Sequence, residues 1–214
     1  IAVKAAVLPF SRFRTPEGVV VDSLLSPEMR STGEVMGLDT HYDTAFAKAQ
    51  AGAGSPLPTE GKVFVSVANH DKRNVIIYAK MLEQLGFEIV STGGTADVLR
   101  RNGVNSTVAS KFAEANGQHS IVDMVRSGEI DLILNTPAGG AARSDGYEIR
   151  AAAVSVGCPV MTTISEFAAA VQAITALREH SWGIISLQEH NEYLHTASSG
   201  EQEDSNQVRE GELS

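Results

Sequence analysis

The chain has 214 residues, enough for one or two domains of ordinary size, and its 43% hydrophobic and 20% charged residues are typical of a globular protein. The formal net charge of −9 argues against a general nucleic-acid binder. The sequence holds no run of roughly 18 apolar residues, so we expect no membrane span. It opens without a signal segment, and its single cysteine, Cys158, cannot form an internal disulfide. We therefore expect a cytoplasmic protein.

Residues 1–51 form the first predicted segment. Residues 1–10 (IAVKAAVLPF) have the composition of a strand, and residues 39–50 have the apolar spacing of a helix. A segment this short cannot bury a core alone, and it starts as a strand already in progress, without an initiator methionine. We therefore expect the edge of a domain whose body lies upstream. Residues 52–61 (GAGSPLPTEG) are rich in glycine and proline, which predicts a linker.

Residues 62–195 alternate between short apolar runs and helical patterns. Strands are predicted at residues 63–67, 87–91, 107–109, 131–135 and 159–162. Helices are predicted at residues 71–85, 92–103, 120–127, 145–156, 165–177 and 186–194, with Asp145 and Ser165 as N-caps and a flexible loop at 138–144. This alternation predicts an α/β domain with a parallel central sheet flanked by helices. Residues 196–214 are acidic and poor in apolar residues, which predicts a disordered tail.

The most informative local feature is the turn Thr92-Gly93-Gly94-Thr95, which joins the second predicted strand of this region to a helix. Such a turn presents free backbone N–H groups and the positive end of a helix dipole to whatever lies above it. Anions, and phosphates in particular, favour that position. The turn therefore predicts a phosphate site with hydroxyl donors from Thr92 and Thr95.

Further polar residues fall at the same predicted edge of the sheet. Lys72 and Lys111 follow the first and third strands and could supply positive charge. Asn135, with Thr136 after it, follows the fourth strand, and its amide could bind a base or a ribose. Ligands of parallel sheets bind at the carboxyl ends of the strands. A glycine turn alone also fits a plain connector, and lysines are usually solvated, so the prediction depends on these positions meeting at one edge.

Several catalytic motifs are missing from the sequence. It contains no GxxxxGK phosphate loop, no GxSxG nucleophile turn and no HExxH or other paired histidine spacing. Cys158 precedes a proline at the start of a strand and has no cationic neighbours in the sequence, so we expect an unreactive thiol. The residues alone therefore predict a binding site and give no catalytic or metal-binding group.

Five motifs, in this order and spacing, resemble the C-terminal part of the large subunit of carbamoyl-phosphate synthase. They are SPEMRSTGEVMG, FVSVANHDKR, STGGTADVLRRNG, GEIDLILNTPAG and DGYEIRAAAV. The resemblance implies that residues 1–51 end the second ATP-grasp half, the half that forms carbamoyl phosphate. It implies that residues 62–195 are the allosteric domain, which has the methylglyoxal-synthase-like fold.

The resemblance also implies a function for the whole enzyme. Members of this family make carbamoyl phosphate from bicarbonate, ATP and ammonia, with Mg²⁺ or Mn²⁺, for arginine and pyrimidine biosynthesis. A small glutaminase subunit supplies the ammonia from glutamine. The ATP and metal ligands would lie upstream of Ile1, so this chain would hold no catalytic residue, cofactor or metal. Its part would be to bind a nucleotide effector, UMP or IMP, through Lys72, Thr92, Gly93, Gly94, Thr95, Lys111, Asn135 and Thr136.

Two departures from the family pattern bear on ligands. Some members have a threonine where this chain has Pro137, which removes one hydroxyl from the effector site. Members that bind ornithine have a carboxylate and a tyrosine at the positions of Ala5 and Val160, and only Thr162 remains of that site. We therefore expect a weak or absent response to ornithine.

Three other functions remain open at this stage. Methylglyoxal synthase has the same fold but needs a carboxylate base, and Asn135-Thr136 offers a neutral amide instead. The cyclohydrolase domain of purine synthesis also carries STGGTA, but its downstream lysine- and histidine-rich stretch is absent. A purely structural oligomerisation module would leave the site empty. Self-association through the regulatory domain is also compatible with effector binding.

Overall fold

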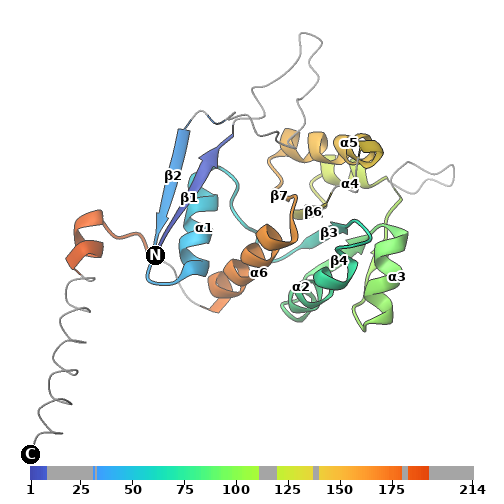
Figure 1. Cartoon of the computed structure of the whole chain (residues 1–214), viewed down its shortest axis with the longest axis horizontal. Coiled ribbons are helices and arrows are strands. Elements are labelled where there is room, and N and C mark those ends of the chain that lie inside the picture. Colours follow the sequence, from blue (N-terminus) through green and yellow to red (C-terminus); the bar gives the residue numbers. More distant parts are fainter. Residues whose placement is uncertain (9–30, 32, 111–119, 137–139, 180–182, 193–214) are drawn as a thin grey trace, which may run out of the picture. The chain divides into compact units, whose positions relative to one another are not determined.

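The computed structural model describes residues 1–8, 31, 33–110, 120–136, 140–179 and 183–192. The chain divides into two compact units, Ile1–His180 and Ser181–Ser214. The first unit contains a two-stranded sheet and a five-stranded sheet, with helices between the strands (Figure 1). Within the part of the chain that is described, no helix is long and apolar enough to cross a membrane.

The five-stranded sheet is parallel throughout and confirms the predicted α/β class. Its strands lie in the order β5-β4-β3-β6-β7, and they are β3 (Lys62–Ser66), β4 (Glu88–Ser91), β5 (Thr107–Val108), β6 (Leu132–Asn135) and β7 (Val160–Met161). The central strand, β3, is buried on both faces, as the unbroken apolar run Val63–Phe64–Val65 requires.

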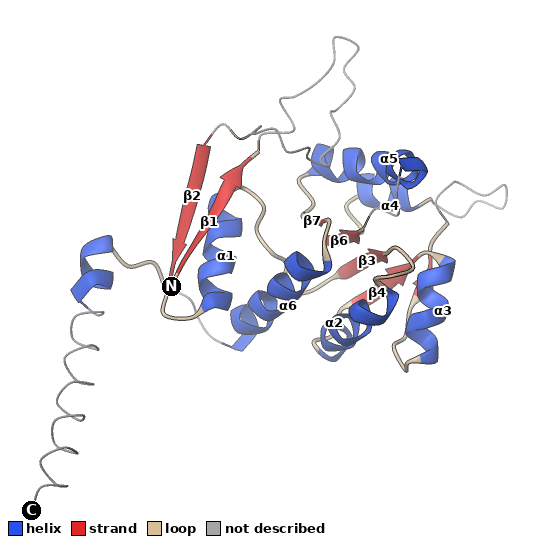
Figure 2. Cartoon of the chain, in the orientation of Figure 1, coloured by secondary structure: helices blue, strands red, loops and turns tan. Residues whose placement is uncertain are grey.

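Helices cover both faces of this sheet (Figure 2). They are α2 (Lys72–Gln84), α3 (Gly93–Arg101), α4 (Ile121–Arg126), α5 (Gly140–Val156) and α6 (Ile164–Glu179). Because neighbouring residues of a strand point to opposite faces, Val65 joins a core cluster with α2 and α6. Phe64 joins a second cluster with α4 and α5. The sheet therefore lies between two separate apolar cores.

The N-terminal segment forms an antiparallel ribbon of β1 (Ala2–Val7) and β2 (Gly33–Leu38), which packs on α1 (Tyr42–Gly52). Strand β1 lies within the predicted strand at 1–10, and α1 matches the predicted helix at 39–50. Strand β2 was not predicted. A Cβ at Gly37 would lie 2.6 Å from the backbone nitrogen of Ala49, so the strand passes too close to α1 for any larger residue. Gly37 permits this approach, and together with Gly33 it hides the strand pattern.

The apolar face of α1 is continuous with one core of the parallel sheet. Phe46 on α1 belongs to the same buried cluster as Phe167 on α6, and α1 packs along α6. Leu57, in the predicted linker 52–61, is only 8% exposed and belongs to this cluster as well. The connection between the ribbon and the sheet is therefore packed against the core.

Three local predictions were wrong. Helix α5 begins at Gly140, so Asp145 is not its N-cap and the loop predicted at 138–144 is helical from Gly140 onward. Alanines and an arginine at 141–143 are good helix formers, which explains the earlier start. The cap of α6 is Thr163 and not Ser165, because Thr163 Oγ1 accepts from the N–H of Glu166 over 3.2 Å. Residues 137–139 lie outside the described part.

The second unit is described only at 183–192. Residues 187–192 are helical, as predicted, and Ser186 caps them. Ser186 Oγ accepts from the N–H of Glu189 over 3.2 Å, and the Glu189 carboxylate accepts from the N–H of Ser186 over 2.7 Å. These two bonds form a reciprocal capping box. The predicted tail at 196–214 lies outside the described residues.

Candidate functional site

The site predicted from the sequence falls where the direction of strand order reverses. From β3 the chain moves outward to β4 and β5, then returns to β6 and β7 on the other side of β3. Crevices at the carboxyl ends of strands flanking such a reversal are the usual ligand sites of doubly wound sheets. Ser66 at the end of β3 pairs with Asn135, and Val65 pairs with Ser91, so the three strands end together. We call this region the carboxyl edge.

The first turn of α3 lies at the carboxyl edge, directly after β4. Thr92 is the N-cap, and its carbonyl accepts from the N–H groups of Thr95 and Ala96, each over 2.9 Å. Gly93 and Gly94 are exposed, and no described group accepts from their N–H groups. A Cβ at Gly93 would meet nothing within 4 Å. Packing therefore does not require glycine there, and its effect is to leave the N–H groups of the turn accessible.

Threonine hydroxyls at the carboxyl edge are already used as acceptors by the backbone of the loop after β3. Ala68 donates its N–H to Thr136 Oγ1 over 2.9 Å, and Val67 makes a longer bond of 3.5 Å to Thr95 Oγ1. Thr95 is 2% exposed and Thr136 is 7% exposed. A hydroxyl has one proton to donate, and these bonds leave that proton available. The buried threonines therefore suit a ligand that accepts hydrogen bonds.

Lys72 contributes positive charge to the same place. It is the first residue of α2, and its Nζ atom lies 3.1 Å from the point that a Cβ of Gly94 would occupy. The lysine thus reaches the first turn of α3. Neither helix has an acidic residue in its first turn, although Asp71 precedes α2 without capping it through its side chain. A cation beside the positive ends of two helix dipoles is unfavourable, and an anion bound between them would remove that repulsion.

Asn135 is held by a residue that the sequence analysis missed. Nη1 of Arg150, on α5, donates to Asn135 Oδ1 over 2.8 Å. Arg150 is fully buried, and Asn135 is 7% exposed. A signal was present in the sequence, because Arg150 occupies an otherwise apolar helical face with Ile149 and Ala153, where a charged residue needs a partner.

The structure brings seven of the eight predicted effector residues to the carboxyl edge. Four come from the turn after β4, two from the end of β6 and one from the start of α2; they are Thr92, Gly93, Gly94, Thr95, Asn135, Thr136 and Lys72. The eighth, Lys111, lies outside the described residues, as does Pro137. The sheet topology and the bonds between its loops account for this convergence.

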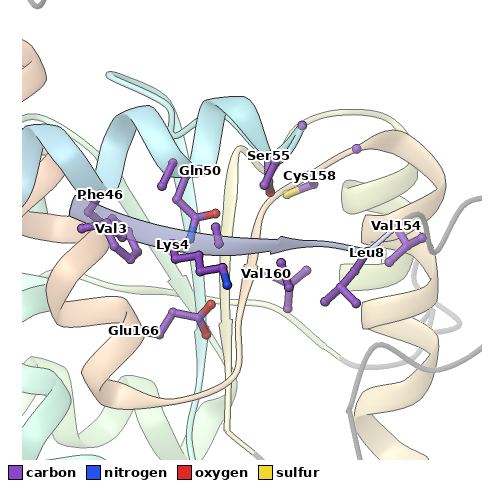
Figure 3. A pocket seen from close by; sticks show the side chains of 16 residues that line it. Val3, Lys4, Leu8, Phe46, Gln50, Ser55, Val154, Cys158, Val160 and Glu166 are labelled. Carbon is purple, nitrogen blue, oxygen red and sulfur yellow. The ribbon is translucent and has the colours of Figure 1, made fainter. Parts of the chain in front are cut away.

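A separate cavity of about 520 Å³ lies between the N-terminal ribbon and the parallel sheet. Ala5 and Val160, the two positions that the resemblance maps to ornithine ligands, both line it. Lys4 and Glu166 also line it, as Figure 3 shows. Burial raises the pKa of Glu166, although its carboxylate accepts from the N–H of Thr162 over 3.1 Å. Among the described residues that line the cavity there is no tyrosine.

Metal-binding groups do not cluster in the described parts of the chain. No three histidine, cysteine, aspartate or glutamate side chains cluster there as a metal site would require. Cys158 donates from Sγ to the carbonyl of Ile130 over 3.3 Å. Burial, together with the negative charge of Asp131, raises the pKa of Cys158 to about 12. The thiol is therefore protonated at neutral pH and unreactive, as predicted.

Comparison with known proteins places this geometry in a recognised class. Residues 74–162 match the family described as the MGS-like domain, so the chain carries a domain of this class. The match runs from α2 to the residue after β7 and includes the α3 turn and Asn135. Fold and family therefore agree.

About nine tenths of the chain is similar to carbamoyl phosphate synthase large chains. It is 69% identical over 193 residues to that of Pseudarthrobacter chlorophenolicus, covering 89% of this chain and 17% of the relative. It is 68% identical over 200 residues to that of Paenarthrobacter aurescens, covering 92% and 18%. For Streptomyces griseus subsp. griseus the identity is 55% over 200 residues, with the same coverage. The chain thus spans less than a fifth of these relatives, and its predicted resemblance to their C-terminal part is confirmed.

Proposed function

We propose that this chain is the regulatory portion of a carbamoyl-phosphate synthase large chain and that its carboxyl edge binds the phosphate of a nucleotide effector, UMP or IMP. The proposal is supported by a cluster in which every group still available to a ligand is a hydrogen-bond donor. It combines the free N–H groups of Gly93 and Gly94, the hydroxyls of Thr95 and Thr136, and Lys72. A phosphate monoester carries about 1.5 to 2 negative charges at neutral pH and three acceptor oxygens, which matches such a cluster.

The proposal extends to the enzyme that would contain this chain. That enzyme would make carbamoyl phosphate from bicarbonate, glutamine-derived ammonia and ATP, with Mg²⁺ or Mn²⁺, for arginine and pyrimidine biosynthesis. A glutaminase subunit would supply the ammonia. The chain itself would bind effector without catalysis, and an effector can regulate only if it binds two states of the whole enzyme with different affinity.

The first test is calorimetric titration of the 214-residue chain with UMP, IMP, inorganic phosphate and ornithine. We expect saturable binding of at least one nucleotide, lost in Lys72→Ala and in Thr95→Ala. Lys80→Ala, at an exposed position later in α2, is the matched control and should bind as the parent does. Equal affinity for phosphate and nucleotides would reduce the site to a generic anion site. Failure of every nucleotide to bind would contradict the proposal.

A second test separates the proposal from a lyase of the same fold. Methylglyoxal synthase chemistry needs a carboxylate to abstract a proton, and the end of β6 offers Asn135 and Thr136 instead. We therefore expect no methylglyoxal from dihydroxyacetone phosphate. Sedimentation with and without UMP tests the structural alternative, because a pure oligomerisation module would associate without responding to a nucleotide.

A further inference from the structure

We infer that Arg150 is the positioning residue of the carboxyl edge: its guanidinium fixes the side-chain amide of Asn135 so that the amide presents N–H donors, and not its oxygen, to the bound ligand. This inference rests on the proposed function, because it concerns the same site. It adds a residue on α5 that contacts no ligand itself and acts through Asn135.

The chemistry of the pair decides which way the amide faces. A guanidinium has five N–H donors and no acceptor, so it can bond only to the oxygen of an amide. Arg150 Nη1 lies 2.8 Å from Asn135 Oδ1. Turning the amide over would put two donors against each other and break a charge-assisted bond. Nδ2 of Asn135 therefore points away from the guanidinium.

The N–H₂ group of Asn135 has no acceptor in the described protein. Asn135 is 7% exposed, and among the described residues the one bond of its side chain is that which Oδ1 accepts from Arg150. A buried amide with two unused protons is unfavourable unless a ligand or water accepts from it. Asn135 ends β6 beside Thr136, so these protons join the other donors at the carboxyl edge.

A glycine in helix α5 leaves the space that Arg150 and Asn135 occupy. A Cβ at Gly146, one turn before Arg150, would overlap the guanidinium and would lie 2.6 Å from Asn135 Oδ1. Glycine within a helix is unfavourable, so its presence here reflects the space that the pair needs. Burying a guanidinium is also unfavourable compared with an apolar side chain. Gly146 and Arg150 are therefore both unfavourable for the stability of α5. We explain their presence by the position that they give to the side chain of Asn135.

The consequence for recognition is that the ligand atom facing Asn135 must be an acceptor. A phosphate oxygen, a ribose oxygen or a base carbonyl meets this requirement, whereas an ammonium or amide N–H does not. Asn135→Asp tests whether the ligand needs a donor at this position. Aspartate keeps an oxygen for Arg150 and a similar volume but offers an acceptor to the ligand. We expect Asn135→Asp to fold normally and to lose UMP binding.

The test is NMR of the 214-residue chain titrated with UMP. In the parent we expect the Asn135 side-chain N–H₂ signals and the Gly93 and Gly94 amide signals to shift together. In Arg150→Met the glycine signals should still shift while the Asn135 signals stop responding, and the Kd for UMP should rise about tenfold, the loss of one hydrogen bond. Arg150→Lys, which keeps a donor and the charge, should recover part of the response.

Gly146→Ala provides a second variant that removes no polar group, in case Arg150→Met does not fold. Its new methyl group should displace the guanidinium and weaken UMP binding, whereas Gly52→Ala in α1, whose Cβ would stand 3.5 Å from Val35, should leave binding unchanged. Asn135 signals that respond normally in Arg150→Met or Gly146→Ala would overturn the inference. If no signal of the parent responds to UMP, the proposed function itself fails.

Discussion

Ala68 and Thr136 are joined by a hydrogen bond of 2.9 Å in which the backbone N–H of Ala68 donates to Thr136 Oγ1. The two residues stand 68 positions apart in the chain, and they are 4% and 7% exposed. The bond ties the loop after β3 to the end of β6, across the reversal in strand order. It also satisfies a buried donor that no strand partner could reach.

Thr136→Val tests this link, because valine has nearly the shape of threonine without the hydroxyl. The buried N–H of Ala68 would lose its acceptor, so we expect the free energy of unfolding to fall by about 1–3 kcal/mol. Urea denaturation of the two proteins measures the difference. Thr136→Ser keeps the hydroxyl and should lose much less stability. Equal stability of Thr136→Val and the parent would mean that water replaces the lost acceptor.

Gly94→Ala should separate folding from binding. The new Cβ would lie 3.1 Å from Lys72 Nζ, which is the flexible end of a long side chain and can move aside. We therefore expect α3 to gain up to about 1 kcal/mol from the better helix propensity of alanine. Binding of inorganic phosphate should weaken, because the methyl group covers the N–H groups of the turn and displaces the lysine.

Thermal unfolding and calorimetry of Gly94→Ala give the two measurements side by side. Gly93→Ala is a useful companion, since its Cβ would meet nothing within 4 Å and would leave Lys72 in place. A binding loss in both variants would implicate the backbone N–H groups, and a loss in Gly94→Ala alone would implicate the lysine. Unchanged phosphate binding in both variants would contradict a ligand site at this helix end.

The alternation of strands and helices along the chain could be predicted because its signals are local. Strands β3 and β6 are unbroken apolar runs, and two of the helices between them end at glycines in the left-handed region, Gly86 with φ +89° and Gly103 with φ +77°. Convergence of Thr92, Thr95 and Asn135 at one edge could be predicted because each lies at the end of a strand and parallel strands end at the same edge. These features depend on residues that are neighbours in the chain.

What could not be predicted depends on residues distant in the chain. Strand β2 is stabilised by β1, which lies about 30 residues earlier, and its own glycines suppress the strand pattern. Arg150 is paired with a residue on another element, and helical periodicity shows only that a charge lies on an apolar face. No local rule names Asn135 as its partner. Tertiary packing therefore determines both strand β2 and the pairing of Arg150 with Asn135.

Low pH should destabilise the N-terminal segment because Asp39 becomes protonated. Burial opposes ionisation of this carboxyl, but a hydrogen bond from Lys48 and the N–H groups of His41 and Thr40 outweigh it and lower the pKa of Asp39 to about 2. Since the folded pKa lies below the ordinary value of 3.8, the stabilisation is present above about pH 4 and is lost as the pH falls through about 2.

Asp39→Asn measures this contribution. At pH 7 we expect the variant to be less stable than the parent, because Lys48, 2.8 Å from the carboxylate, loses its partner. The gap in the free energy of unfolding should narrow below about pH 4 and close only below pH 2, where Asp39 of the folded parent becomes fully protonated. Asp43→Asn, in the first turn of α1, is the control for removing an acid nearby. A gap that does not narrow between pH 4 and pH 2 would show that shape, and not charge, explains the difference.

The contribution of Glu166 to stability should depend on pH in the direction opposite to that of Asp39. Burial in the wall of the 520 Å³ cavity raises its pKa, so the folded chain disfavours the ionised carboxyl. A raised folded pKa gives a contribution to stability that is complete below the ordinary value of 4.5 and is lost as the pH rises through the folded pKa. Glu166→Gln removes the charge and keeps an oxygen to accept from the N–H of Thr162, a bond of 3.1 Å in the parent.

We therefore expect Glu166→Gln to be more stable than the parent at pH 7 and equally stable below about pH 4.5, when urea denaturation is repeated across the pH range. Glu179→Gln, at an exposed position on the same helix, should show no such pH-dependent difference in stability from the parent. A variant that is less stable than the parent at pH 7 would contradict this account. It would mean that a cation of the protein, such as Lys4 in the wall of the same cavity, compensates the carboxylate.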